Sequence, residues 1–105
     1  MIFIHRPRIL RQSAALRSLV AETSLTPNDL IAPLFIDEGS EVRTAIASMP
    51  GYFRCSLDVT LKEVKELWQM GIRCVLLFVK AADATKDNKG TEALNPDGLM
   101  QRSIK

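Results

Sequence analysis

The sequence is poor in the residues that bind metals or build disulfide frameworks. Its 105 residues include two cysteines and one histidine. Cys55 and Cys74 show no Cys-x-x-Cys or Cys/His spacing, so they do not form a recognisable zinc-binding pattern. We interpret both as reduced, buried thiols of a cytoplasmic protein. His5 has no acidic or thiol neighbour and is predicted to be a surface residue rather than a metal ligand.

Long hydrophobic runs and a strong net charge are also missing. The apolar opening, Met1 to Ile4, is interrupted by His5 and Arg6 and is too short for a signal peptide or a membrane span. A net charge of +2 gives no strong attraction to nucleic acid or to a membrane surface. We therefore expect neither a membrane nor a nucleic-acid partner, and we expect the protein in the cytoplasm.

The first part of the chain lacks acidic residues. No aspartate or glutamate precedes Glu22, whereas Arg6, Arg8, Arg11 and Arg17 are all present. Pro7 and the charged residues around it predict that the first twelve residues form an extended basic arm. The arginines are too few and have too few aromatic residues between them to favour a nucleic-acid site, so solvated charge is one simple interpretation.

The rest of the chain has the composition of a globular domain, with 47% apolar and 25% charged residues. Ser13 is the expected N-cap of a helix from Ala14 to about Glu22. The apolar run from Leu30 predicts a strand whose regular part is Pro33 to Ile36. Residues 42–47 fit either a short strand or an irregular loop. Ser56 is the expected N-cap of an amphipathic helix over 57–70, which Gly71 closes.

A second apolar run, Cys74 to Val79, shows no alternation of polar and apolar residues. This pattern is typical of a central parallel strand that is covered on both faces. Together with the preceding strand and helix it predicts a βαβ unit. A long polar loop follows, and Asn95 and Pro96 are expected as N-cap and first residue of a last helix over 97–105. Lys86 to Gly90 do not follow the P-loop order, which favours a solvated loop over a phosphate cradle.

The predicted elements do not complete a domain. The last helix has no C-terminal Gly, Asn or Pro signal. Two parallel strands cannot cover one another's faces, so Val75, Leu77 and Phe78 lack neighbours. We therefore expect the sequence to be the opening part of a larger α/β domain.

Several short segments occur in an order and spacing typical of one enzyme family. They are Arg6-Pro7-Arg8, Pro33-Leu34-Phe35, Ser48-Met49-Pro50-Gly51, Gly71-Ile72, Leu77-Phe78, Lys86-Asp87-x-x-Gly90-Thr91-x-Ala93 and Asn95-Pro96-Asp97-Gly98. From Arg6 onward the chain resembles the N-terminal third of the delta-aminolevulinic acid dehydratase (porphobilinogen synthase) family. The resemblance implies an α/β fold: an N-terminal arm with a short helix (1–25), then the first two βα units of a TIM (β/α)8 barrel (26–105), which is incomplete here.

The resemblance also implies a function. Enzymes of this family are lyases that condense two molecules of 5-aminolevulinate to porphobilinogen in tetrapyrrole (haem) biosynthesis. Their Schiff-base lysines and their zinc or magnesium ligands lie on later strands, so we assign no catalytic, cofactor or metal residue and expect this chain alone to be inactive. The family forms homo-oligomers of the octamer type in which arms embrace neighbouring barrels. Arg6, Arg8 and Arg11 would then be subunit-interface residues.

One segment departs from the family pattern. Relatives commonly have Gly or Pro after the aromatic residue of the second strand, where this chain continues Val79-Lys80-Ala81-Ala82-Asp83. Lys80 is expected to be solvated and paired with Asp83, and a substrate contact is the alternative. A second hypothesis for the whole chain is an anion- or nucleic-acid-binding module built from the basic arm and the Lys86 to Gly90 loop.

Overall fold

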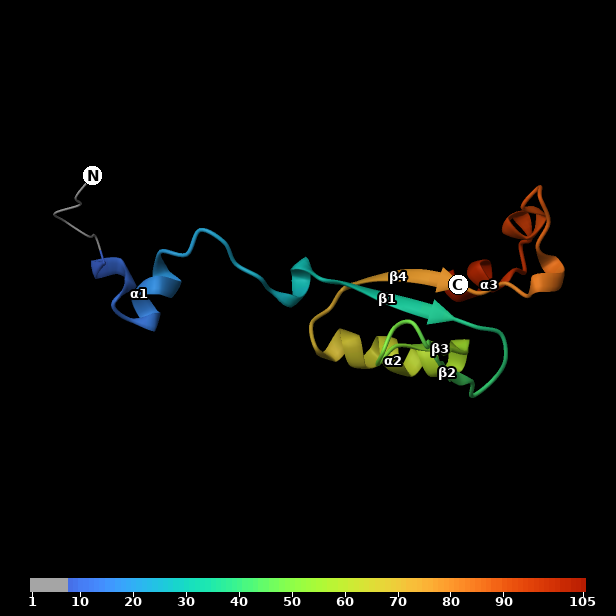
Figure 1. Ribbon diagram of the computed structural model, residues 1–105, viewed down its shortest axis with the longest axis horizontal. Helices are drawn as coiled ribbons and strands as arrows, with labels where there is room; N and C mark the ends of the chain where they lie inside the picture. Colours follow the sequence, from blue (N-terminus) through green and yellow to red (C-terminus); the bar gives the residue numbers. More distant parts are fainter. Residues whose placement is uncertain (1–7) are drawn as a thin grey trace.

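The chain folds into one mixed sheet with a helix on one face and an extended arm at its N-terminal end (Figure 1). A computed structural model describes residues 8–105. The sheet has the strand order β2-β3-β1-β4. Its strands are β1 (Ile31–Ile36), β2 (Arg43–Ala45), β3 (Phe53–Cys55) and β4 (Cys74–Val79). The helices are α1 (Ala14–Leu19), α2 (Leu57–Gln69) and α3 (Leu99–Ile104), with 3-10 turns η1 (Ile9–Arg11), η2 (Pro27–Asp29), η3 (Asp83–Thr85) and η4 (Thr91–Leu94).

The two predicted strands pair as expected. β1 and β4 are parallel along their whole length, from Ile31 opposite Cys74 to Ile36 opposite Val79. β1 begins at Ile31, two residues before the predicted regular part, and Pro33 lies inside it opposite Leu76. The chain crosses between these strands through α2, which confirms the predicted βαβ unit.

A hairpin of two short strands, of which the sequence indicated at most the first, adds to the sheet. β2 pairs antiparallel with β3, and β3 pairs in parallel with the end of β1, with Phe35 opposite Arg54. The two strands are joined by a turn in which the Tyr52 amide donates to the Met49 carbonyl at 3.0 Å and Gly51 has a φ of +83°. Residues 43–45 are therefore a strand, and β3 was not predicted.

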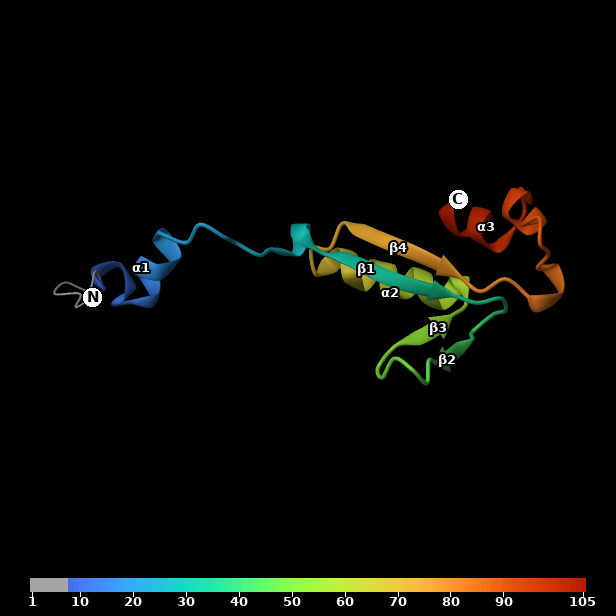
Figure 2. The same cartoon turned by 45° about the horizontal axis from the view of Figure 1, so that its top comes forward.

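Helix α2 covers one face of the sheet (Figures 1 and 2). Leu34 and Ile36 of β1 are 4% and 1% exposed, and Thr60 of α2 is also buried. Side chains alternate along a strand, so Phe35 lies on the opposite face, which α2 does not cover. The amphipathic pattern predicted for α2, in which Leu61 and Trp68 belong to the apolar face, is only partly correct. Leu61 and Trp68 are exposed, and the Arg73 guanidinium lies 3.8 Å from the centre of the Trp68 ring.

The ends of the helices agree only partly with the expected caps. Ser13 caps α1 as predicted, because its Oγ accepts from the Leu16 amide at 3.1 Å, but α1 ends at Leu19 rather than at Glu22. Gly71 follows α2 with a left-handed φ of +92°, as predicted. Ser56 occupies the N-cap position of α2, but its hydroxyl accepts from the Val42 amide and donates to Asp58 instead of capping the helix amides.

The prediction for the last helix was wrong about its start. The N-cap of α3 is Gly98 and its first residue is Leu99. Asn95 instead forms a turn, in which its Oδ1 accepts from the Asp97 amide and its carbonyl accepts from the Gly98 amide, both at 3.0 Å. The side chain that was expected to start the helix therefore closes the turn before it.

Strand β4 lies at the edge of the sheet, although the sequence predicted a central strand. Within residues 8–105 it pairs with β1 alone. Val75, Leu76 and Phe78 remain 37%, 51% and 45% exposed, and Cys74 is exposed as well. The composition of this strand suits burial on both faces, and no described residue covers its outer face or its free edge.

The arm extends away from the sheet (Figures 1 and 2). It contains η1 and α1, which contact each other, and it lengthens the molecule to 71 × 34 × 27 Å. Leu19 and Leu25 in this region are 80% and 78% exposed. None of the described helices has the length and apolar character needed to cross a membrane.

Candidate functional site at the carboxyl end of the sheet

The parallel strands bring three loops to one end of the sheet. β1, β3 and β4 all point the same way, so the segments after Ile36, Cys55 and Val79 leave from the same edge. In parallel α/β folds, ligands bind at this carboxyl edge. Two cavities open here, one on each side of the end of β4.

The first cavity lies on the face that α2 leaves uncovered. It has a volume of about 350 Å³ and combines aromatic, aliphatic and cationic residues. Its lining residues are Phe35, Ile36, Arg54, Phe78, Val79, Lys80, Ala81 and Lys86. Phe35 and Phe78 stack with ring centroids 5.2 Å apart, and Tyr52 meets Phe35 edge-on at 6.3 Å. We name this space the cationic cavity.

Carboxylates engage two of the three cations around this cavity. Arg54 Nε lies 3.6 Å from Asp37 Oδ2, and Lys86 Nζ lies 2.6 Å from Asp83 Oδ1. The hydrogen bond from Lys86 is the main cause that lowers the pKa of Asp83, and the charges of Lys86 and then Lys80 lower it further. Lys80 is exposed as predicted, but the ion pair expected with Asp83 is wrong, because Asp83 pairs with Lys86 instead.

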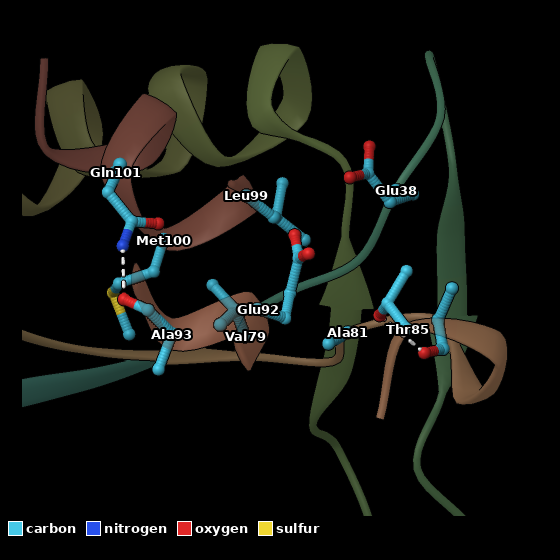
Figure 3. Close-up of a pocket in the computed structure, with 10 residues that line it drawn as sticks. Glu38, Val79, Ala81, Thr85, Glu92, Ala93, Leu99, Met100 and Gln101 are labelled. Atoms are coloured by element: carbon cyan, nitrogen blue, oxygen red, sulfur yellow. Dashed lines mark hydrogen bonds between the residues drawn. The ribbon is translucent and has the colours of Figure 1, made fainter. Parts of the chain in front are cut away.

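The second cavity, of about 330 Å³, lies between the end of β4 and α3 (Figure 3). Its walls are largely apolar and include Val79, Leu99 and Met100. Polar groups at its rim already have partners. Gln101 donates to the Ala93 carbonyl at 2.8 Å, and Glu38 pairs with Arg102 at 2.6 Å. The Glu92 carboxylate accepts a hydrogen bond from the side-chain Nδ2 of Asn95 at 3.1 Å. The polar side chains around this cavity are thus already engaged with other parts of the chain.

The loop of Lys86 to Gly90 turns inward on itself. Asp87 accepts from the amides of Lys89 and Thr91, each at 3.0 Å, and from the Thr91 hydroxyl. These hydrogen bonds, with that from the Thr91 hydroxyl first, lower the pKa of Asp87. Because Asp87 accepts from the Lys89 and Thr91 amides, these amides are not free to bind a phosphate, which agrees with the predicted solvated loop.

Comparison with known proteins identifies the family. The family model described as delta-aminolevulinic acid dehydratase matches residues 4–105. The chain belongs to the delta-aminolevulinic acid dehydratase family. It is 46% identical over 99 residues to the enzyme of that name from Chlamydia pneumoniae, covering 94% of this chain and 30% of the relative. The Bacillus subtilis relative is 42% identical over 100 residues, or 95% of this chain and 30% of its own length.

A solved structure shows the same fold at comparable identity. The crystal structure of delta-aminolevulinic acid dehydratase (porphobilinogen synthase) from Toxoplasma gondii, in complex with its reaction product porphobilinogen, matches with a TM-score of 0.89 and 41% identity. The match covers 97% of this chain and 29% of the Toxoplasma chain. The predicted family and fold are thereby confirmed, and the chain spans about 30% of the length of the relatives it matches.

Of the predicted interface arginines, the structure describes Arg8 and Arg11 and brings neither of them to the candidate site. Arg8 and Arg11 are exposed in the arm, while Arg6 and His5 lie outside the described residues. Arg17 Nη1 donates to the Arg11 carbonyl at 3.0 Å, which ties α1 to η1. Arg8, Arg11 and Arg17 therefore belong to the arm and not to the sheet.

The site contains residues that the sequence did not single out. Arg54, which pairs with Asp37, was missed because β3 is only three residues long and was not predicted. The one available signal was the alternation of Phe53, Arg54 and Cys55, which is too short to identify a strand. Of the two cysteines, Cys55 is buried as predicted, whereas Cys74 is exposed because β4 forms the edge of the sheet.

Proposed function

We propose that this chain supplies the arm and the first two βα units of a porphobilinogen synthase barrel, with residues 1–25 as the arm and 26–105 as the barrel segment. The complete enzyme would condense two molecules of 5-aminolevulinate to porphobilinogen, the first pyrrole of haem and other tetrapyrroles. The observation that carries the proposal is the structural match to the Toxoplasma enzyme, with a TM-score of 0.89 over 97% of this chain. A match of this quality at 41% identity includes the loops at the carboxyl edge, and not only the strands.

Within that barrel, the face that α2 leaves uncovered would point inward. Barrel interiors are filled by side chains from alternate positions of the strands, and active sites lie at the carboxyl end. Phe35 and Phe78 occupy such positions near the ends of β1 and β4. They would form an apolar wall of the site, and the cationic cavity above them would border the substrates.

The 105 residues are not expected to catalyse the reaction by themselves. The family resemblance implies that the Schiff-base lysines lie on later strands. Schiff-base lysines are commonly desolvated in a hydrophobic pocket, whereas Lys80 is exposed. Incubation of the chain with 5-aminolevulinate and borohydride should therefore give no covalent adduct by mass spectrometry. A trapped lysine would contradict the expectation and would point to Lys80 first.

The family resemblance also implies zinc or magnesium in the complete enzyme. Residues 8–105 do not supply such a site. Within residues 8–105 no group of three His, Cys, Asp or Glu side chains could hold a metal ion. We therefore assign no ligand in this chain and derive no step that depends on a metal.

For the complete protein we propose a cytoplasmic homo-oligomer of the octamer type. Support comes from the arm, which lies apart from its own sheet and exposes Leu19 and Leu25 together with Arg8 and Arg11. Arg6, Arg8 and Arg11 would meet carboxylates of a neighbouring subunit, where the guanidinium forms bidentate hydrogen bonds. The two free cysteines are consistent with the reducing conditions of the cytoplasm.

A chimaera tests the proposed function directly. Residues 4–105 would replace the matched segment of the Bacillus subtilis relative, which is 42% identical over 100 residues. We expect the purified chimaera to form porphobilinogen from 5-aminolevulinate, with the unexchanged Bacillus enzyme as the reference. A chimaera that folds and assembles like the reference but makes no pyrrole would refute the proposal.

A further inference from the structure

Two neighbouring acidic residues after β1 contact arginines from two other elements. Asp37 Oδ2 lies 3.6 Å from Arg54 Nε of β3, and Glu38 Oε1 accepts from Arg102 Nη2 of α3 at 2.6 Å. Arg54 lines the cationic cavity, whereas Glu38 lines the second cavity, on the other side of the end of β4. The two carboxylates therefore point to opposite sides of the carboxyl edge, as the side chains of consecutive residues in a strand do.

The segment from η4 through α3 forms one hydrogen-bonded unit. Gln101 Nε2 donates to the Ala93 carbonyl at 2.8 Å, and Arg102 Nε donates to the Asp97 carbonyl at 3.0 Å. Both donors stand in α3 and both acceptors stand in the loop before it. Residues 91–105 are therefore held together by their own hydrogen bonds.

One ion pair connects this unit to the loop after β1. In the described chain, the contact of Arg102 with Glu38 is the only hydrogen bond or ion pair that joins residues 81–105 to the rest. The two side chains are 44% and 52% exposed, so the pair contributes little to global stability. The hydrogen bond to Asp97 already orients the guanidinium, however, so that little side-chain entropy is lost when Glu38 binds it.

The loop that leads to this unit carries cations of the candidate site. Lys80 lines the cationic cavity directly after β4, and Lys86 lines it from the end of η3. Between β4 and α3 the chain forms only the two short 3-10 turns η3 and η4. An anchor at α3 therefore limits the positions that the whole loop can take.

We propose that Arg102 and Glu38 are positioning residues, which hold the loop of residues 80–98 against the loop after β1 and so fix one wall of the candidate site. Neither side chain lines the cationic cavity, so both act through the loop and not by contact with a ligand. The inference rests on the proposed function for its effect on the reaction, because that effect requires the complete barrel.

Amide hydrogen exchange, measured by NMR on the 105-residue chain, tests the anchoring of the loop. Glu38→Gln removes the charge and keeps the size of the side chain. We expect the Ala93 and Asn95 amides, which are hydrogen-bonded within the loop, to exchange about fivefold faster, the effect of losing one charge-assisted hydrogen bond at a partly exposed site. The amides of β1 and β4 should keep their rates. Glu66→Gln, at an exposed position of α2, is the matched control and should change neither set.

A double variant tests whether the two residues act as a pair. Arg102→Gln should accelerate exchange at least as much as Glu38→Gln, because it also removes the hydrogen bond to the Asp97 carbonyl. The double variant should exchange no faster than Arg102→Gln alone, because both changes remove the same contact. Unchanged exchange in Glu38→Gln, equal acceleration by Glu66→Gln, or additive effects in the double variant would overturn the inference.

The chimaera described above tests the effect on the reaction. There Glu38→Gln should raise the KM for 5-aminolevulinate about threefold and leave kcat within about twofold, because a displaced loop weakens substrate binding without a change at the reacting atoms. A pair with only a structural role would lower the amount of folded enzyme and leave KM unchanged, so an unchanged KM in an active chimaera would refute the positioning role alone. An inactive chimaera would refute the proposed function, while the exchange rates of the chain itself still decide whether the pair holds the loop.

Discussion

Phe35 and Phe78 stack on each other across the parallel pair of β1 and β4, with centroids 5.2 Å apart and ring planes inclined by 15°. They lie directly opposite in the register and on the face that α2 does not cover. The contact therefore joins the two strands where the described chain offers no other layer, and it forms the floor of the cationic cavity.

The stacked pair should be energetically coupled. Phe35→Leu and Phe78→Leu, alone and combined, form a double-mutant cycle whose coupling energy we expect to be roughly 0.5–1.5 kcal/mol, the typical contribution of an aromatic pair beyond area burial. Urea denaturation followed by circular dichroism gives the free energies of unfolding. Phe53, which lies under the Arg43 guanidinium at 3.9 Å, provides the control cycle with Phe78. If the free energies of the two single variants simply add in the Phe35–Phe78 cycle, or if the control cycle shows the same coupling energy, the stacking contact does not stabilise the fold.

Two glycines with left-handed φ angles differ in their surroundings. A Cβ on Gly71 would lie 3.3 Å from Pro27 Cβ, whereas at Gly51 nothing lies within 4 Å. Gly51→Ala should cost roughly 1–2 kcal/mol for the left-handed backbone alone. Gly71→Ala should cost more, because η2 must also move. Free energies of unfolding from urea titration compare the two variants, and an equal loss would mean that the Pro27 contact is not strained.

Much of this fold could be predicted because the strongest signals are local. The apolar run of β4, the amphipathic pattern of α2 and Gly71 after it are all read from a few consecutive residues. The family could also be predicted, because its short motifs keep their order along the chain. Each of these features depends on residues close in sequence.

The features that were missed depend on distant contacts. β3 is three residues long and exists because it pairs with β1 and β2. Arg54 enters the candidate site only through that pairing, so no sequence period reveals it. The composition of β4 indicates coverage on both faces, yet the described residues place it at an edge. For Asn95, a turn and a helix cap use the same short polar side chain, and the local pattern cannot separate them.

Asp58 should make stability depend on pH. Ser56 Oγ donates to it at 2.5 Å and the Glu41 amide at 3.0 Å, at a position where Glu41 has a φ of +54°. The hydrogen bond from Ser56 is the main cause that lowers the pKa of Asp58 below its ordinary value of 3.8. Since the pKa is lower in the folded state, the stabilisation is fully present above the ordinary value and is lost as the pH falls from there through the folded-state pKa.

Asp58→Asn removes this titrating group. The free energy of unfolding of this variant should lie below that of the parent chain at pH 6. The gap should narrow as the pH falls below about 4 toward the lowered folded-state pKa, because the unfolded parent chain takes up the proton there before the folded one does. Denaturation of both proteins at several pH values gives the difference directly. A gap that stays constant over this range would contradict the role given to the carboxylate.

The two thiols should react at different rates. Cys74 is exposed on the edge strand β4, whereas Cys55, the last residue of β3, is only 3% exposed. Burial raises the pKa of Cys55, the charge of Glu63 raises it further, and Arg43 partly opposes them. A thiol reagent at neutral pH should therefore modify one equivalent at once and the second only with unfolding. Cys74→Ser should abolish the fast phase and Cys55→Ser should retain it. Equal rates would show that Cys55 is accessible in the folded chain.

The free edge and exposed face of β4 should make the chain self-associate. Val75, Leu76 and Phe78 are 37%, 51% and 45% exposed, next to backbone groups that pair with no described strand. Exposed edges of this kind pair with other chains, and exposed apolar patches are rarely left in water. We expect sedimentation velocity to show a weight-average mass that rises with concentration.

Leu76→Lys should reduce this association, because a charge on an edge strand opposes pairing between sheets. The matched control is Leu94→Lys, at a position in η4 that is 85% exposed and outside the sheet. It adds the same charge but leaves the edge of β4 intact, so it should leave the concentration dependence unchanged. If the parent chain is a monodisperse monomer with a cooperative unfolding transition, β4 is stable at the edge without a partner. If both variants reduce association equally, the effect comes from net charge and not from the strand.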